Sequence, residues 1–297
     1  MAVTAEPRKL VATFLALTTV FAAICYTPIL RAHTLGVNHG MWVLALMWSP
    51  GVAGLITRLV WQHNLRGHGW GWGPWRYPAL AYVLPPLACV IVYGLVWVTG
   101  FGGFSATHFV TALGRGFGHP GMGFPMALLL AATVGFVASM TSATGEELGW
   151  RGVLVPELSK FSSFTKTSLV TGVIWAVYHY PAIFFTNYHA QGSRIVSFAA
   201  FTVLCFAACV ILTWLRLRSG SVWPAAIFHA SHNLFVQDVF DQLTISKSRT
   251  EYVTTEFGVG LAIVYSLVAL WLWRRRHEVA ASVTPVELHV EASAAAV

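Results

Sequence analysis

The chain has 297 residues, of which 56% are hydrophobic and only 10% are charged. Soluble globular domains carry about 25% charged residues, so this composition excludes a soluble class and predicts an all-α, polytopic membrane protein. The formal net charge of +7 indicates contact with anionic lipid, with no nucleic-acid partner.

Eight segments are long and apolar enough to cross a bilayer, which takes about 17–25 residues of helix. In chain order they are Leu10–Leu30, Met41–Trp61, Tyr77–Phe101, Pro125–Gly145, Thr167–Thr186, Ile195–Leu215, Ser221–Gln237 and Phe257–Trp273. The second, with Arg58 and Pro50, and the seventh, which is short and carries two histidines, depart most from an uninterrupted apolar span. The first follows Arg8 and Lys9 but is too long for the apolar region of a signal peptide, so we expect an uncleaved span.

Lys and Arg residues are distributed unequally between alternate loops. With eight spans, thirteen of them fall on the side of the two termini and five on the opposite side. Because positive charges concentrate in cytoplasmic loops, this asymmetry predicts that both termini are cytoplasmic, in a protein of the plasma membrane. We expect one integral membrane domain over 1–276 and a disordered cytoplasmic tail over 277–297, whose composition offers little to pack.

Two outer segments and the cysteines complete the outline. Gly102–Phe124 is rich in Gly, Phe and His, which suits an interfacial or re-entrant position, and Asp238–Glu256 is expected to be a polar outer loop. All four cysteines fall in apolar spans, where we expect small hydrophobic side chains, with neither a disulfide framework nor a cysteine zinc site. They are Cys25, Cys89, Cys205 and Cys209.

Two adjacent glutamates stand at the end of the fourth span. Glu146 and Glu147 follow twenty-five residues that carry no charge, and a charged side chain at membrane depth costs about 2.5–3.5 kcal/mol even on a lenient scale. Residues i and i+4 share a helix face, so Glu147 can pair with Arg151 while Glu146 points elsewhere. We therefore expect a structural Glu147–Arg151 ion pair and an unpaired Glu146 that enters a cavity as a general base.

Two further motifs place histidines on later spans. Trp175 and His179 are four residues apart in the fifth span, and His229 and Asn233 have the same spacing in the seventh. Each pair shares one helix face. A carboxylate pair, two histidines and an asparagine on otherwise apolar helices are hard to explain as scaffolding, so we expect one built site.

Simple structural roles are expected for three neighbouring residues. A lone intramembrane histidine is usually a hydrogen-bond partner between helices, and this is our interpretation of His232. Glu157, beyond the ion pair, is expected to be an interfacial charge. Trp175 is expected to pack, as most of the thirteen tryptophans do.

The order and helical placement of these motifs resemble the CPBP family of intramembrane proteases (the ABI family), which includes the type II CAAX prenyl endopeptidases. The family pattern is Glu-Glu-x-x-x-Arg on one helix, an aromatic-x-x-x-His on the next and His-x-x-x-Asn/Asp on a later one. In this chain the pattern is carried by Glu146, Glu147 and Arg151, then Trp175 and His179, then His229 and Asn233. The resemblance covers a protease core of about 125–240, and Trp175 stands where many members have Phe.

The resemblance implies peptide-bond hydrolysis near the cytoplasmic side of the membrane. Glu146 and His179 would activate a water, and His229 and Asn233 would stabilise the oxyanion, which agrees with what these groups can accept or donate. Glu146, His179 and His229 could instead ligate zinc with a fourth position open for water. The chain has no His-Glu-x-x-His motif, and Asn233 is a poor zinc ligand, so we favour a mechanism without a metal or other cofactor.

Three functions from different classes fit these residues. The leading hypothesis is an intramembrane endopeptidase acting on a membrane-associated protein or peptide, with prenylated CAAX tails as one candidate substrate. A proton-coupled transporter could relay protons through Glu146 and His179, but the first three spans lack a second polar cluster. The third function is a non-catalytic regulatory or immunity protein with the same fold.

The depth of the site sets a geometric condition. For Glu146 to meet His179, either the fourth span continues as helix through Glu146 and the fifth begins below the membrane surface, or one of the helices tilts. We expect a water-filled cavity that reaches into the cytoplasmic half of the membrane.

Overall fold

The computed structural model describes residues 6–119 and 121–279. The tail predicted over 277–297 lies outside the described residues from position 280 onward. The larger helices are α1 (Pro7–Ala32), α2 (Met41–Gln62), α3 (Arg76–Val98), α4 (Ala106–Gly116), α5 (Phe124–Leu130), α6 (Phe136–Gly149), α7 (Val155–Ser159), α8 (Phe164–Phe185), α9 (Arg194–Ser219), α10 (Trp223–Asn233) and α11 (Val259–Arg274).

Shorter elements link these helices. Three π-helical segments continue α5, α6 and α10, and they are η3 (Ala131–Gly135), η4 (Trp150–Leu154) and η5 (Leu234–Phe240). Three 3₁₀ turns lie in connections, namely η1 (Val37–Gly40), η2 (Arg66–His68) and η6 (Thr250–Tyr252). The strands β1 (Gly103–Phe104) and β2 (Thr244–Ile245) pair antiparallel and so join the two predicted outer segments to each other.

Every one of the eight predicted spans coincides with helix in the structure. Six helical stretches of the described chain are long and apolar enough to cross a membrane, and α11 is a shorter apolar helix. The all-α, polytopic membrane fold is therefore confirmed. The stretch from Phe124 to Ser159 is continuous over 36 residues, so the fourth span does continue as helix past Glu146, which is part of the first of the two alternatives in the depth argument.

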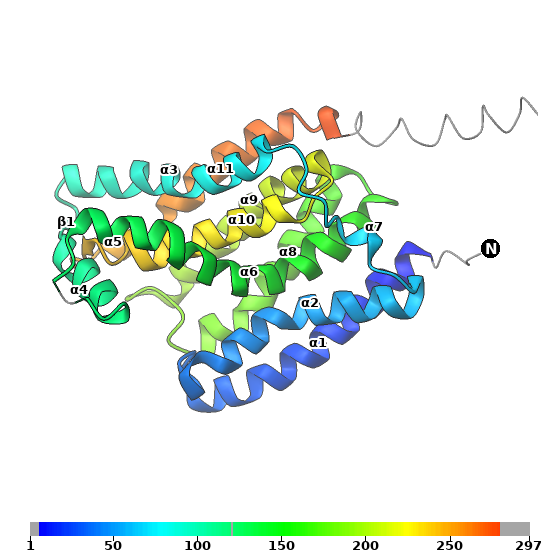
Figure 1. The fold of residues 1–297 in the computed structure, drawn as a ribbon, viewed down its shortest axis with the longest axis horizontal. Helices are drawn as coiled ribbons and strands as arrows, with labels where there is room; N and C mark the ends of the chain where they lie inside the picture. The colour runs from blue at the N-terminus through cyan, green and yellow to red at the C-terminus, as the bar shows by residue number, and fades with distance from the viewer. Residues whose placement is uncertain (1–5, 120, 280–297) are drawn as a thin grey trace, which may run out of the picture.

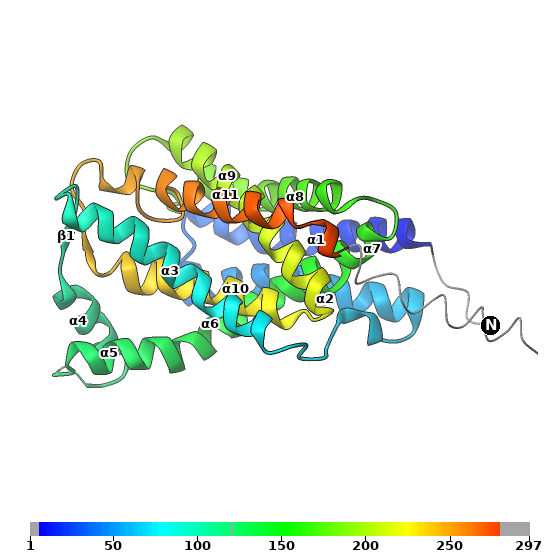
Figure 2. The same ribbon diagram turned by 90° about the horizontal axis from the view of Figure 1, so that it is seen from above.

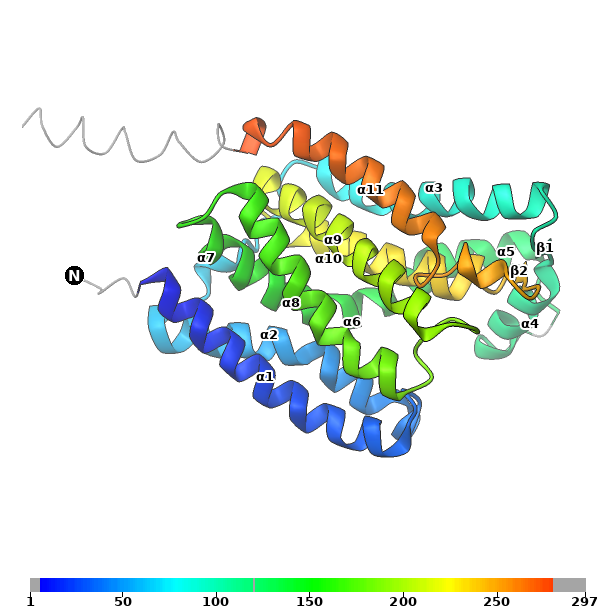
Figure 3. The same cartoon turned by 180° about the vertical axis from the view of Figure 1, so that it is seen from behind.

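The helices form three layers (Figure 1). α1 and α2 pack together on one side, α3 and α11 lie on the other, and α6, α8, α9 and α10 fill the middle. Seen from above and from behind, α8 and α9 run side by side (Figures 2 and 3). The start of α1 and the end of α11 lie at the same end of the molecule, while β1 lies at the opposite end.

Close backbone contact fixes α2 against α6. A Cβ built on Gly149 would lie 2.5 Å from the backbone carbon of Pro50, and one built on Gly51 would lie 2.4 Å from the carbonyl oxygen of Gly145. Small residues let membrane helices approach this closely and gain van der Waals contact. The approach places α2 directly beside the turn of α6 that carries Glu146 and Glu147.

Replacing Gly149 with alanine should destabilise the protein by about 1–3 kcal/mol, because the new Cβ would overlap the backbone of Pro50. Thermal unfolding in detergent measures the effect. Gly94→Ala in α3 is the matched control, since a Cβ there meets no atom within 4 Å and alanine favours helix. Equal melting temperatures for the two variants would contradict the tight α2–α6 contact.

Candidate active site

The four predicted catalytic residues line one cavity of about 160 Å³ inside the helical bundle. Glu146 comes from α6, His179 from α8, and His229 and Asn233 from α10. Trp175 and His232 also contribute to its wall. The structure thus brings together, from three helices, every side chain that the motifs selected for the chemistry.

Glu146 is held by two tryptophans. Its side chain is buried, and Oε2 accepts hydrogen bonds from the indole Nε1 of Trp175 at 2.8 Å and of Trp150 at 3.2 Å. Glu146 has no ion-pair partner among the described residues, as expected, but two neutral indole donors satisfy one of its oxygens. Trp175 was expected only to pack, yet it also orients the carboxylate. Trp150 was missed, although its i+4 spacing from Glu146 was a usable signal.

Glu147 forms the predicted ion pair with Arg151 and a second bond that the sequence did not predict. Its Oε1 lies 3.0 Å from Nη1 of Arg151, and Nδ1–H of His229 donates to the same oxygen at 3.0 Å. Arg151 Nη2 also contacts Sγ of Cys209 at 3.1 Å on α9. Glu147 consequently fixes the His229 ring so that Nε2 is the nitrogen left for the cavity.

His179 is oriented by its own helix. Nδ1–H donates to the carbonyl oxygen of Trp175 at 2.8 Å, which leaves Nε2 for the cavity. Asn233 closes α10 and lines the same cavity. Its side-chain amide makes no hydrogen bond to any other residue that the structure describes, so both its donor and its acceptor are available to a bound molecule.

Two charged or polar residues nearby have structural partners. His232 Nδ1 lies 2.9 Å from the Tyr265 hydroxyl on α11, which confirms its role as a hydrogen-bond partner between helices. The prediction that Glu157 is an interfacial charge is wrong. Its side chain is buried and pairs with Arg58 at 3.3 Å. This pair explains how the second span accommodates an arginine.

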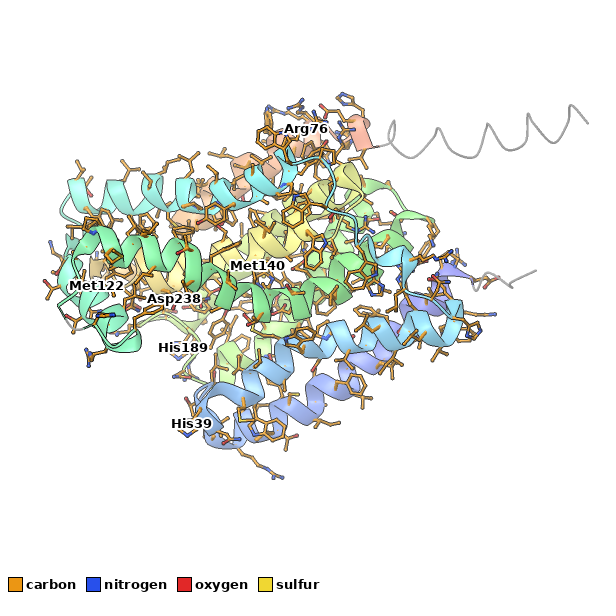
Figure 4. All side chains as sticks on the ribbon, viewed as in Figure 1. His39, Arg76, Met122, Met140, His189 and Asp238 are labelled. Carbon is orange, nitrogen blue, oxygen red and sulfur yellow. The ribbon has the colours of Figure 1, made fainter. Side chains whose placement is uncertain are left out.

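The cavity extends toward the ends of the helices that lie away from the termini. Leu35 of the α1–α2 connection, Tyr188 of the α8–α9 connection and Glu256 of the segment before α11 all line it. His39 and His189, labelled in Figure 4, mark the first two connections. The connections at the terminal end, over 63–75, 160–163 and 220–222, supply no wall residue in the part of the chain that the structure describes.

This placement links two of the predictions. Cytoplasmic termini and a cavity in the cytoplasmic half of the membrane cannot both hold, because the cavity lies toward the end of the bundle that is opposite to the start of α1 and the end of α11. Hydropathy gives the direction of each helix but not the side to which the space between the helices opens.

The same three residues, Glu146, His179 and His229, are the candidate ligands of a zinc site. Glu146 retains Oε1, and His179 and His229 each retain Nε2, while their Nδ1 atoms are fixed by a carbonyl and a carboxylate. No three His, Cys, Asp or Glu side chains among the described residues are close enough together to hold a metal ion. The arrangement therefore does not fit a preformed metal centre.

Comparison with known proteins agrees with the motif pattern. Residues 127–235 match the Rce1-like family of type II CAAX prenyl endopeptidases. A protein of Methanococcus maripaludis named CAAX prenyl protease 2 is 34% identical over 99 residues, which are 32% of this chain and 36% of that protein. The chain thus matches about a third of the length of this curated relative. The resemblance to the type II CAAX endopeptidases is confirmed, and the matched segment contains the four predicted catalytic residues.

The two adjacent glutamates should differ sharply in their contribution to stability. Glu147→Ala leaves the guanidinium of Arg151 buried without its carboxylate and should cost about 3–5 kcal/mol. Glu146→Ala removes an acceptor from two neutral indoles and should cost about 1–3 kcal/mol. Unfolding of both variants in mixed micelles measures the two losses of stability. Equal losses would contradict the conclusion that Glu147 makes the stronger structural contacts.

Proposed function

We propose that this protein is an intramembrane endopeptidase that hydrolyses peptide bonds of membrane-associated proteins. The observation that carries the proposal is a buried carboxylate, Glu146, in one cavity with two histidines whose Nε2 atoms are uncommitted. The name of the Methanococcus maripaludis relative, CAAX prenyl protease 2, supports peptide hydrolysis and makes a prenylated CAAX peptide, supplied to the purified protein, the first substrate to assay.

The first step is attack by water on the scissile carbonyl. Glu146 accepts a proton from the water while Nε2 of His179 orients it, and the water oxygen bonds to the carbonyl carbon. The two indole donors on Oε2 leave Oε1 of Glu146 as the natural proton acceptor. The carbonyl oxygen then carries the negative charge of a tetrahedral intermediate.

The second step expels the amine. The oxyanion accepts a hydrogen bond from the amide of Asn233 and, when His229 is protonated, from its Nε2–H, while Nδ1–H remains on Glu147. The carbon–nitrogen bond then breaks, and the proton held by Glu146 passes to the leaving nitrogen. Glu146 thus acts first as base and then as acid, and we propose that the water is activated without a metal.

Hydrolysis of a quenched farnesylated CAAX peptide by the purified protein tests this function. Glu146→Ala should lower kcat about 100-fold to 10,000-fold, since a positioned general base contributes that much. A zinc chelator should leave the wild-type rate unchanged. Inhibition by the chelator would overturn the metal-free mechanism, and cleavage that survives Glu146→Ala would remove Glu146 from the chemistry.

We further propose that the protein lies in the plasma membrane with cytoplasmic termini, so that the cavity opens on the outer side. Of the thirteen Lys and Arg residues on the side of the termini, only Arg58, Arg151 and Arg216 are buried, and the ten that remain still outnumber the five opposite. The favoured substrates then present their scissile bond to the outer half of the membrane, and a cytoplasmic prenylated tail would approach the wrong end.

Labelling of intact cells tests this orientation. A membrane-impermeant maleimide should label His39→Cys near the mouth, whereas Lys160→Cys at the opposite end should react only after the cells are opened. Both positions are exposed, and the four native cysteines are buried. The reverse pattern would place the mouth in the cytoplasm and favour a prenylated cytoplasmic tail.

A further inference from the structure

A second carboxylate, Glu256, faces the cavity that holds Glu146. It belongs to the segment just before α11 and is only 6% exposed. Oε1 accepts a hydrogen bond from Nε2 of Gln237 at 2.9 Å, and the Tyr188 hydroxyl also donates to this carboxylate. The residue lies outside the matched segment and outside every motif, and the hydrolytic steps above do not use it.

Glu256 lacks a strong cationic partner. Within the described residues its ion pair is with His232 alone, at 4.0 Å, and the other ring nitrogen of that histidine already contacts Tyr265. No Lys or Arg lines the cavity in the part of the chain that the structure describes. Burial raises the pKa of Glu256 to about 7, assisted by the charge of Glu146 and opposed by Tyr188, Gln237 and His229.

A cluster of aromatic rings includes Tyr188, which bonds to this carboxylate, and Phe257, the next residue in the chain. The rings of Tyr188 and Phe257 have centroids 4.9 Å apart, and Phe201 stacks on Phe257 at 5.5 Å. Tyr188 and Phe201 also line the cavity itself. Aromatic faces attract ammonium and guanidinium groups, and more strongly where water is excluded. A buried carboxylate beside such rings is a favourable environment for an organic cation.

We propose that Glu256 and the adjoining aromatic rings form a subsite that binds an arginine or lysine side chain of the peptide substrate. The proposal rests on the endopeptidase function and specifies its substrate class. A guanidinium or ammonium group would supply the positive charge that Glu256 lacks, and charge-assisted hydrogen bonds are about twice as strong as neutral ones. A peptide with a basic residue near its scissile bond would be selected by this cavity.

Paired peptide libraries test the subsite. One set of quenched peptides of Ala, Leu and Ser carries a single arginine stepped along the sequence, and the twin set carries citrulline, which has nearly the same shape without the charge. At the position that reaches Glu256, the arginine peptide should have a kcat/KM about tenfold or more above its citrulline twin, because a hydrogen bond to a charged group is worth that much.

Variants of Glu256 test whether this residue causes the preference for arginine over citrulline. Glu256→Gln should reduce the arginine rate to that of the citrulline peptide, Glu256→Asp should keep part of the preference, and Asp238→Asn should keep all of it. Asp238 is an exposed acid on the same outer segment (Figure 4) that does not line the cavity. The preference in the wild type should grow from pH 6 to pH 8, as Glu256 ionises, and should be flat in Glu256→Gln.

Peptide binding to a variant that lacks the general base tests the subsite independently of hydrolysis. Fluorescence anisotropy of the same peptides on the Glu146→Gln variant should favour arginine over citrulline, and adding Glu256→Gln should abolish the difference. If no peptide is cleaved but this binding preference is seen, the endopeptidase function fails and the subsite stands. Equal binding of the two peptides, or a preference that survives Glu256→Gln, overturns the subsite.

Discussion

The shared oxygen of Glu147 is the interaction on which the site depends. A single Oε1 atom receives Arg151 from the next turn and His229 from α10, and Arg151 reaches Cys209 on α9. In a low-dielectric interior, removing either Glu147 or Arg151 leaves the charge of the other without compensation. The geometry of the cavity is therefore maintained by the same contacts that hold three helices together.

Much of the fold could be predicted from hydropathy, because each span has to satisfy its backbone hydrogen bonds as helix. The Glu147–Arg151 pair followed from i,i+4 spacing alone. The i,i+4 spacing of Trp150 from Glu146 indicates a shared helix face, but only the structure shows that its indole donates to the carboxylate. Glu256 is far from the motifs in sequence, and only tertiary packing brings it to the cavity.

The burial of Glu157 illustrates the same limit. The position of Glu157 beyond the apolar run predicts a charge in contact with water, and Arg58 interrupts the apolar sequence of the second span. The two are partners, at 3.3 Å, on helices separated by about a hundred residues. The sequence of one helix shows that a charged residue would be buried at a cost in free energy. It does not show which residue of another helix offsets that cost by pairing with the charge.

The 36-residue helical stretch from Phe124 to Ser159 makes bilayer thickness a variable of the site. At 1.5 Å per residue it is about 54 Å long, whereas the hydrocarbon core is about 30 Å thick. Such a mismatch is accommodated by tilt or by local thickening of the lipid. This stretch carries Glu146 and Glu147, and the Glu147–His229 hydrogen bond ties it to α10. A tilt that accommodates the bilayer therefore has to be shared by the helices that form the cavity, and acyl-chain length is a condition to hold fixed when the site is assayed.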